Sequence, residues 1–195
     1  MREINNKSGA FISVVVILVL TFLMIFILSD DITFWNIVKR LPTAVTIYGL
    51  ILIVFVKWLW KCRIFKGWLV LIPDLSGEWT GKLKTTYTGT KTGKKKRDIK
   101  IDAIIKQELF SVSVTMKTKE MKSYSYVAGF DIDNKQNRNK ICYSYTSKPR
   151  PEYREGSPIH DGTALLDIIG NPPTKLEGEY WTTRRTTGTI ELERS

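Results

Sequence analysis

The chain has 195 residues and a formal net charge of +11, a length that suits one domain with an appended segment. Its single histidine, His160, excludes a histidine-rich metal site and a two-histidine mechanism. The two cysteines, Cys62 and Cys142, are too few for a disulfide framework, and this usage favours a reducing compartment.

The first part of the chain contains a long uncharged segment. Residues 9–28 carry no charge, and about twenty apolar residues are what a helix needs to cross roughly 30 Å of hydrocarbon. A cleaved signal peptide is the alternative, but this run exceeds a usual hydrophobic region and no small-residue cleavage site follows it. We therefore predict a membrane anchor here.

Residues 41–56 form a second, shorter apolar run. Lys57 can extend its ammonium group to the interface and Trp58 and Trp60 suit the headgroup region, so the span extends to about residue 60. A buried core helix of a soluble domain is the alternative interpretation. Two such runs in tandem favour a transmembrane helical hairpin over residues 1–66, with spans at about 9–28 and 41–60.

The basic residues that flank the two spans predict the orientation of the hairpin. Segments rich in Lys and Arg next to a span stay on the cytoplasmic side. The flanking residues are Arg2, Lys7, Lys57, Lys61, Arg63 and Lys66, against Lys39 and Arg40 between the spans. We expect both termini, and all that follows the hairpin, to be cytoplasmic.

A linker over residues 67–74 leads to a segment that alternates between apolar and polar residues in short runs. We expect eight strands, at about 75–88, 97–107, 109–118, 122–133, 138–147, 162–169, 175–184 and 186–193. Short strands joined by hairpins can close into a barrel that has no exposed edge. The predicted fold class is a membrane-anchored all-β protein, with a compact eight-stranded antiparallel up-and-down β-barrel over residues 75–195.

Alternation also predicts which side chains point into the barrel. The candidate ligand-binding residues are Trp79, Tyr124, Tyr126, Tyr143, Tyr145, Tyr180, Thr182 and Arg184. Tyr and Trp supply stacking faces and hydrogen bonds together, and an arginine suits an anionic ligand. The alternative is that the tyrosines only pack, with their hydroxyls at the barrel ends. A barrel of this size is either filled by side chains or holds one small ligand.

Each of two loop motifs has a purely structural interpretation and a functional one. "KTGKKKR" at 91–97 is typical of a solvated hairpin tip, with contact to anionic lipid headgroups or to nucleic acid as alternatives. "GSPIHDGT" at 156–163 brings together Ser157, His160 and Asp161, but sequence neighbours on a short loop rarely form a catalytic triad. We predict no catalytic residues and no metal site, and a loop at the barrel mouth where His160 can touch a ligand.

The stretch "LSGEWTG" at 75–81 resembles the G-x-W signature of lipocalin-type barrels. In those barrels the tryptophan packs near an arginine of the closing strands. The resemblance implies that Arg184 or Arg185 packs on Trp79 here.

The whole arrangement of two spans, a short basic linker and an eight-stranded barrel that begins "LSGEWTG" resembles one family. This family comprises the two-transmembrane β-barrel effectors of bacterial cyclic-oligonucleotide-based anti-phage signalling systems (CBASS). The resemblance implies that the barrel binds a cyclic dinucleotide made by a cognate nucleotidyltransferase after infection. Binding then promotes homo-oligomerisation, and the hairpins disrupt the inner membrane and kill the cell before the phage matures.

In such a mechanism the ligand must bridge subunits or order a loop that does so. A ligand shifts the assembly equilibrium only if its affinity differs between the free and the assembled forms. The segments around 88–97 and 148–162 are the candidates. A competing interpretation is a membrane-tethered, lipocalin-like module for an apolar ligand without a lethal output. An enzyme acting on a membrane-proximal substrate is a third, for which the sequence offers no nucleophile or acid–base pair.

Overall fold

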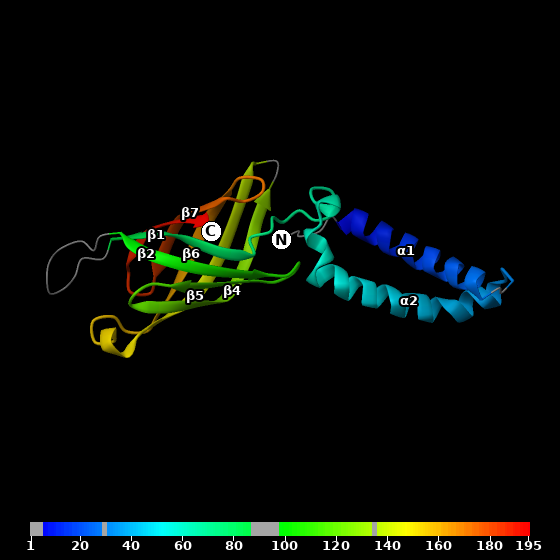
Figure 1. Ribbon diagram of the computed structural model, residues 1–195, viewed down its shortest axis with the longest axis horizontal. Helices are drawn as coiled ribbons and strands as arrows, with labels where there is room; N and C mark the ends of the chain where they lie inside the picture. Colours follow the sequence, from blue (N-terminus) through cyan, green and yellow to red (C-terminus); the bar gives the residue numbers. More distant parts are fainter. Residues whose placement is uncertain (1–5, 29–30, 87–97, 134–135) are drawn as a thin grey trace. The chain divides into compact units, whose positions relative to one another are not determined.

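The computed structural model describes residues 6–28, 31–86, 98–133 and 136–195 (Figure 1). The chain divides into two compact units, with the break between Leu71 and Ile72. The first unit is helical and the second is a β-barrel. Each unit is described on its own below.

The helical unit contains α1 (Asn6–Ile27) and α2 (Phe34–Lys57). Both helices are long and apolar enough to cross a membrane. Only 11% of the apolar window of α1 and 6% of that of α2 is buried, whereas the core helix of a soluble domain would be mostly buried. The exposed apolar faces therefore favour membrane spans over core helices.

A hydrogen bond ties the two helices together within this unit. The Tyr48 hydroxyl donates to Ser13 Oγ at 2.5 Å, and Ser13 Oγ donates to the Gly9 carbonyl at 2.8 Å. Hydrogen bonds between helices in lipid contribute modestly, on the order of 1 kcal/mol. The pair therefore helps to fix the register of α1 against α2.

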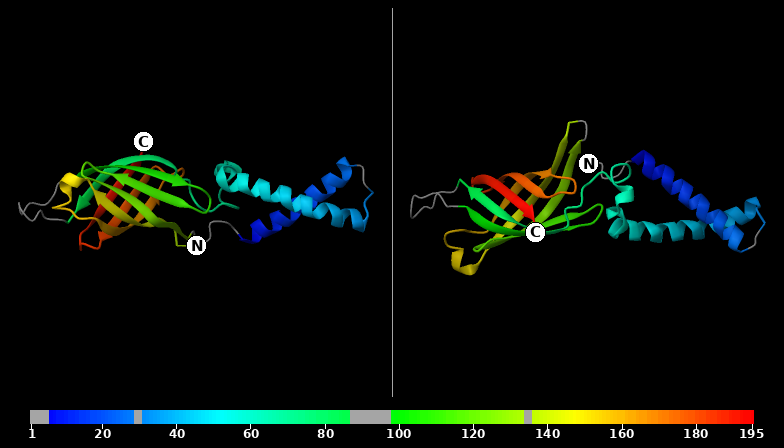
Figure 2. Two further views of the ribbon diagram at one scale, coloured as in Figure 1. Left: turned by 90° about the horizontal axis from the view of Figure 1, so that it is seen from below. Right: turned by 45° about the horizontal axis from the view of Figure 1, so that its top comes forward.

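The second unit is a closed barrel of eight antiparallel strands in sequential order, as the sequence predicts. The strands are β1 (Gly77–Thr85), β2 (Ile99–Gln107), β3 (Val112–Lys117), β4 (Met121–Asp133), β5 (Arg138–Pro149), β6 (His160–Ile169), β7 (Lys175–Thr182) and β8 (Thr187–Arg194). Figure 2 shows that the long β4–β5 hairpin projects beyond its neighbours at one end. Because β1 pairs with β8, the barrel has no free edge.

A plug built around Trp79 closes the end of the barrel where β1 begins. The indole is fully buried, and its Nε1 donates to the Leu75 carbonyl at 2.9 Å. The Arg194 guanidinium lies 5.4 Å from the ring centre, within the range of a cation–π interaction. It also donates to the carbonyls of Ser76, Asp74 and Pro173, at 2.5, 3.3 and 3.3 Å.

The arginine of this plug is not one of those expected from the sequence. Arg184 and Arg185 were the expected partners of Trp79, and this expectation is wrong. The chain reverses direction at the β7–β8 turn, so both residues lie at the opposite end of the barrel. In the β1–β8 ladder it is Arg194 that pairs with Trp79.

A β-bulge in β4 changes which tyrosines face inward. The pairing of β4 with β5 shifts between Ser125 and Val127. An extra residue in one strand reverses the side-chain alternation on one side of the bulge. Tyr124 and Tyr126 are therefore 44% and 62% exposed, whereas Phe130 after the bulge is buried. The expectation that these two tyrosines point inward is wrong.

The plug predicts a stability effect at Arg194. Arg194→Ala should lower the free energy of unfolding of the barrel by about 2 kcal/mol, because three carbonyls lose a charged donor. Arg194→Lys should recover only part of the loss, since an ammonium group lacks the planar fork of donors. Urea unfolding followed by tryptophan fluorescence measures both, with the exposed Arg185→Ala as the control. Equal midpoints for Arg194→Ala and Arg185→Ala would contradict the role of the plug.

Candidate ligand-binding site

The other end of the barrel holds an internal pocket of about 240 Å³. Its wall is made by the ends of β1, β3, β5 and β7, the starts of β2, β4 and β6, and the loops that precede β6 and β8. Apolar side chains such as Ile101 and Met116 lie beside hydroxyl-bearing residues such as Ser123 and Ser147. Mixed walls of this kind are typical of small-molecule sites, which combine apolar surface with a few polar groups.

The structure brings four of the eight candidate residues together around this pocket: Tyr145, Tyr180, Thr182 and Arg184. Tyr143 is fully buried beside Tyr145, with ring centres 5.9 Å apart, and its hydroxyl donates to Met116 Sδ at 3.5 Å. Trp79 belongs to the plug at the opposite end.

Tyr124 and Tyr126 lie outside the barrel, away from the pocket, because of the bulge. The sequence-derived set of eight is therefore divided among the pocket, the packing behind it, the plug and the outer surface.

Two glycines make room for the tyrosine rings of the pocket. A Cβ atom at Gly162 would lie 2.7 Å from the Tyr145 ring carbon that bears the hydroxyl. At Gly188 it would lie 2.6 Å from Cε1 of Tyr180 and clash with the Lys84 carbonyl. Side chains larger than hydrogen would displace the rings, so these two strand glycines position the tyrosines.

The tyrosine hydroxyls remain neutral and can donate hydrogen bonds. Burial raises the pKa of Tyr145, and the neighbouring Tyr180 raises it further. Burial likewise raises the pKa of Tyr180, against a hydrogen bond with Thr85 that lowers it. Among the described residues, the Tyr145 hydroxyl has no hydrogen-bond partner although it lines the pocket. It is therefore available to a ligand.

The β7–β8 turn sets the position of Arg184. Thr182 N donates to the Thr186 carbonyl at 3.0 Å, and Arg185 adopts a left-handed conformation with φ 60°. This is the pattern of a hairpin loop that closes with a left-handed residue. Arg184 lines the pocket, and its Nη1 donates to Ser157 Oγ at 2.9 Å.

Ser157 belongs to a loop over residues 150–159 that forms one side of the pocket. A 3₁₀ turn at Pro151–Tyr153 starts this loop, and Ser157 N donates to the Tyr153 carbonyl at 3.0 Å. Tyr153, Gly156 and Ser157 all contribute to the pocket wall. The bond between Arg184 and Ser157 therefore joins two loops across the mouth of the barrel.

His160 lies at the mouth, as expected, and has one fixed hydrogen bond. Its Nδ1 lies 2.9 Å from the Pro158 carbonyl, which can only accept, so Nδ1 carries the proton in the neutral ring. Burial lowers the pKa of His160, and the nearby Arg184 lowers it further, against the Pro158 bond and Asp161. The neutral ring presents Nε2 as an acceptor.

The side chains of Ser157, His160 and Asp161 do not form a hydrogen-bonded triad. Ser157 accepts from Arg184, His160 donates to Pro158, and Asp161 accepts from the Thr146 hydroxyl at 2.6 Å. Within the described ranges, no group of three or more His, Cys, Asp or Glu side chains could hold a metal ion.

Sequence reasoning missed most of the polar wall of the pocket. The additional lining residues include Thr85, Thr118, Glu120, Ser123, Ser147, Tyr153, Ser157 and Thr186. All of them lie near strand ends or in the loops between strands. In an antiparallel up-and-down barrel the ends of alternate strands meet at one mouth, and this rule would have grouped these residues. The "KTGKKKR" segment at 91–97 lies outside the described residues.

Comparison with known proteins gives consistent matches. A family model described as the Cap15 cyclic dinucleotide receptor domain matches residues 70–194. CD-NTase-associated protein 15 of Staphylococcus schleiferi is 31% identical over 180 residues, which cover 90% of each chain. The protein of the same name from Escherichia albertii is 25% identical over 167 residues, or 81% of each chain.

The lowered pKa of His160 predicts how acid affects stability. The unfolded chain holds the proton more tightly than the folded chain, so the free energy of unfolding should fall as the pH drops below about 6.5 and level off below the folded-state pKa. Because His160 is the single histidine, His160→Gln should remove this loss between about pH 7.5 and about pH 5.5. Urea midpoints at the two pH values test it. Parallel losses in the wild type and the variant would contradict it.

Proposed function

The chain belongs to the Cap15 family of cyclic dinucleotide receptors, and we propose that its barrel binds a cyclic dinucleotide in the pocket at its mouth. The observation that supports this most is the convergence of Tyr145, Tyr180 and Arg184 on one pocket. Phenol rings can stack on bases, and a guanidinium group pairs with phosphate through parallel hydrogen bonds. The signal comes from the cognate nucleotidyltransferase of an anti-phage CBASS system.

The pocket volume has a consequence for binding. At about 240 Å³ the pocket is slightly smaller than the roughly 300–1,000 Å³ of common ligand sites. A cyclic dinucleotide must therefore extend through the mouth or displace the 150–159 loop. We infer that a phosphate takes the Nη1 donor of Arg184 that now binds Ser157 Oγ. Ligand binding thus releases this loop from the β7–β8 turn.

The released loop offers a route from ligand to assembly. A ligand favours the assembled form only if its affinity differs between the free and the assembled states. The 148–162 segment was one sequence-derived candidate for this coupling, and the described 150–159 loop falls within it. The other candidate, 88–97, lies outside the described residues.

The output of assembly is disruption of the inner membrane and death of the infected cell. Helices α1 and α2 span the bilayer as a hairpin, with both termini and the barrel in the cytoplasm, because the flanking basic residues favour that side. Assembly brings several hairpins into one patch of membrane. No catalytic step is required, so the protein acts as a receptor and effector, homo-oligomeric when the ligand is bound.

Binding should depend on Arg184 and on the free hydroxyl of Tyr145. Against a calorimetric panel of cyclic di- and trinucleotides with linear dinucleotides as controls, we expect at least one cyclic dinucleotide to bind. Its affinity should fall at least about tenfold in Arg184→Ala and severalfold in Tyr145→Phe, since about 1.4 kcal/mol corresponds to tenfold. Arg185→Ala, in the same turn, is the matched control. No binding across the panel by a folded chain would favour the apolar-ligand alternative.

Membrane disruption should require both the ligand and Arg184. The full chain, reconstituted in vesicles of bacterial phospholipids, should release an entrapped dye when the cyclic dinucleotide that binds best is added. Arg184→Ala should need at least about tenfold more ligand for the same release, in line with its lost affinity. Ligand-independent leakage that is equal in both chains would contradict the proposed coupling.

A further inference from the structure

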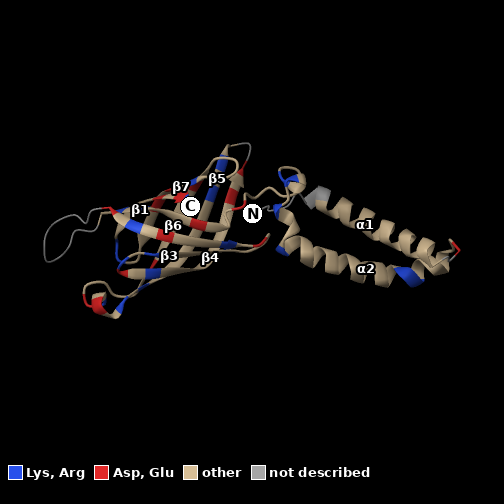
Figure 3. Ribbon diagram, viewed as in Figure 1, with Lys and Arg blue, Asp and Glu red and all other residues tan. Residues whose placement is uncertain are grey.

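A basic and aromatic segment follows α2 over residues 57–68 and is here called the juxtamembrane segment. Its basic residues are Lys57, Lys61, Arg63 and Lys66. No acidic residue lies between Asp31 and Asp74, so the neighbouring chain does not offset this charge. Figure 3 shows basic residues where α2 ends, whereas the middle of α2 carries no charge. The positive charge is therefore concentrated directly after the candidate span.

The juxtamembrane segment is folded rather than extended. Two 3₁₀ turns, Leu59–Lys61 and Arg63–Phe65, are separated by a single residue. A tight loop then closes, because Val70 N donates to the Phe65 carbonyl at 2.8 Å and Gly67 N donates to the Val70 carbonyl at 2.9 Å. These bonds hold the side chains of the segment in a defined arrangement.

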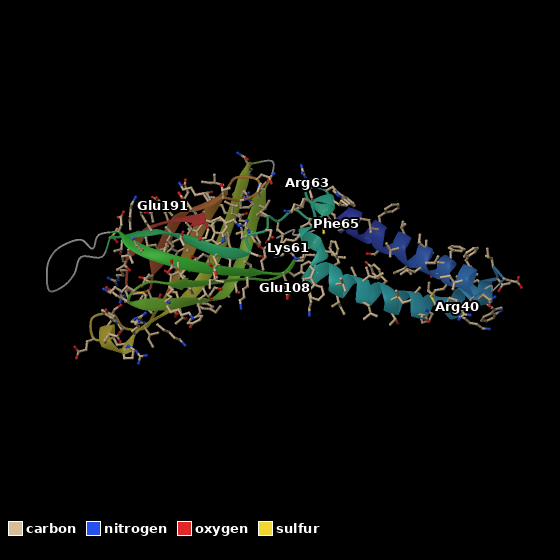
Figure 4. The ribbon with its side chains drawn as sticks, viewed as in Figure 1. Arg40, Lys61, Arg63, Phe65, Glu108 and Glu191 are labelled. Carbon is tan, nitrogen blue, oxygen red and sulfur yellow. The ribbon has the colours of Figure 1, made fainter. Side chains whose placement is uncertain are left out.

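An aromatic contact brings the second 3₁₀ turn back to the end of α2. The ring of Phe65 packs edge to face on that of Phe55, with centres 5.0 Å apart. Phe55 lies in α2, two residues before the helix ends at Lys57. Figure 4 labels Lys61, Arg63 and Phe65 beside this end of the helix. With α2 as a membrane span, the contact keeps the second turn at the level of the lipid headgroups.

Apolar side chains of the juxtamembrane segment face outward. Trp58, Ile64 and Trp68 are 66%, 76% and 47% exposed. The indole Nε1 of Trp68 donates to the Ile64 carbonyl at 2.5 Å, which holds the ring against the second 3₁₀ turn. Tryptophan is favoured at a membrane interface because its ring is apolar and its N–H group is polar. The segment therefore offers apolar surface at the depth where acyl chains begin.

The charge of the segment is available to a ligand. Lys57, Arg63 and Lys66 are exposed, and within the described ranges none of them forms an ion pair. The Lys61 ammonium group lies 5.5 Å from the ring centre of Trp60, which is fully buried and does not reach the interface as the sequence suggested. Three exposed cations next to exposed apolar side chains fit a surface that is anionic outside and apolar beneath.

We propose that the juxtamembrane segment binds the headgroup phosphates of anionic phospholipids. Lys57, Arg63 and Lys66 contact the phosphates, while Trp58 and Ile64 insert among the upper parts of the acyl chains. An acidic protein would satisfy only the cations, whereas a lipid layer satisfies both kinds of side chain. Each hairpin thus gathers anionic lipid around itself, which makes membrane charge a determinant of its action. This inference rests on the proposed span of α2 and not on the nucleotide pocket.

Local fluorescence quenching tests the inference on the full chain in vesicles without nucleotide. Cys62 is exposed between Lys61 and Arg63, so a bimane label there, in a Cys142→Ser background, reports on the lipids beside the segment. Phosphatidylglycerol and phosphatidylcholine, each brominated near the top of its acyl chains, serve as quenchers. We expect phosphatidylglycerol to associate at least about fivefold more strongly, because about 1 kcal/mol for each nearby Lys or Arg corresponds to about fivefold.

The preference should depend on the positive charge of the segment. Lys57→Gln, Arg63→Gln and Lys66→Gln together should lower it at least about threefold. Lys57→Arg, Arg63→Lys and Lys66→Arg together should retain it, since they keep the charge. The control with Lys82→Gln, Lys106→Gln and Lys148→Gln removes the same charge from the barrel wall and should behave like the wild type. Raising the salt from about 50 mM to about 500 mM should weaken the wild-type preference, because exposed charges are screened.

Four results would overturn the inference: a Cys62 label that neither lipid quenches, equal association of the two lipids, a glutamine variant that keeps the wild-type preference, or a wild-type preference unchanged by salt. The salt series needs no variant, so it decides even where a variant misfolds. A chain that does not float with the vesicles would instead remove the span, and the inference with it. Calorimetry keeps the receptor function apart, since the glutamine variant should bind a cyclic dinucleotide as the wild type does.

Discussion

The pocket depends on the contact between Arg194 and Trp79 at the opposite end of the barrel. One guanidinium group lies against the indole and donates to three carbonyls, which belong to the chain before β1 and to the β6–β7 turn. These contacts fill that end and fix where β1 and β8 pair. With one end filled, the space left inside an eight-stranded barrel lies at the other end, where the two loops joined by Arg184 and Ser157 form the mouth.

The architecture was accessible from the sequence because it depends on properties that repeat along the chain. Long uncharged runs indicate helices such as α1 and α2, and short alternating runs separated by turns indicate the eight strands. Sequential hairpins then leave one simple way to close the sheet. The orientation of single residues was less accessible, because one extra residue at Ser125–Val127 moves Tyr124 and Tyr126 to the outside without leaving a mark in the alternation.

The candidate site was predictable only in part, because the position of a single side chain depends on the strand register. Tyr145, Tyr180, Thr182 and Arg184 lie on β5, on β7 and in the β7–β8 turn, so alternation and the strand end identified them. The glycines at 162 and 188 sit on the neighbouring strands β6 and β8, and their role becomes visible only when the register places them against the tyrosine rings. Ser157 becomes part of the site only through its contact with Arg184.

The measurement that tests this account most directly is a structure of the full chain with its cyclic dinucleotide bound. The account predicts a ligand at the mouth, with the rings of Tyr145 and Tyr180 beside its bases and a phosphate within hydrogen-bond distance of Arg184, which has released Ser157. A ligand bound on the outer surface at Tyr124 and Tyr126, with the bond between Arg184 and Ser157 intact, would contradict it.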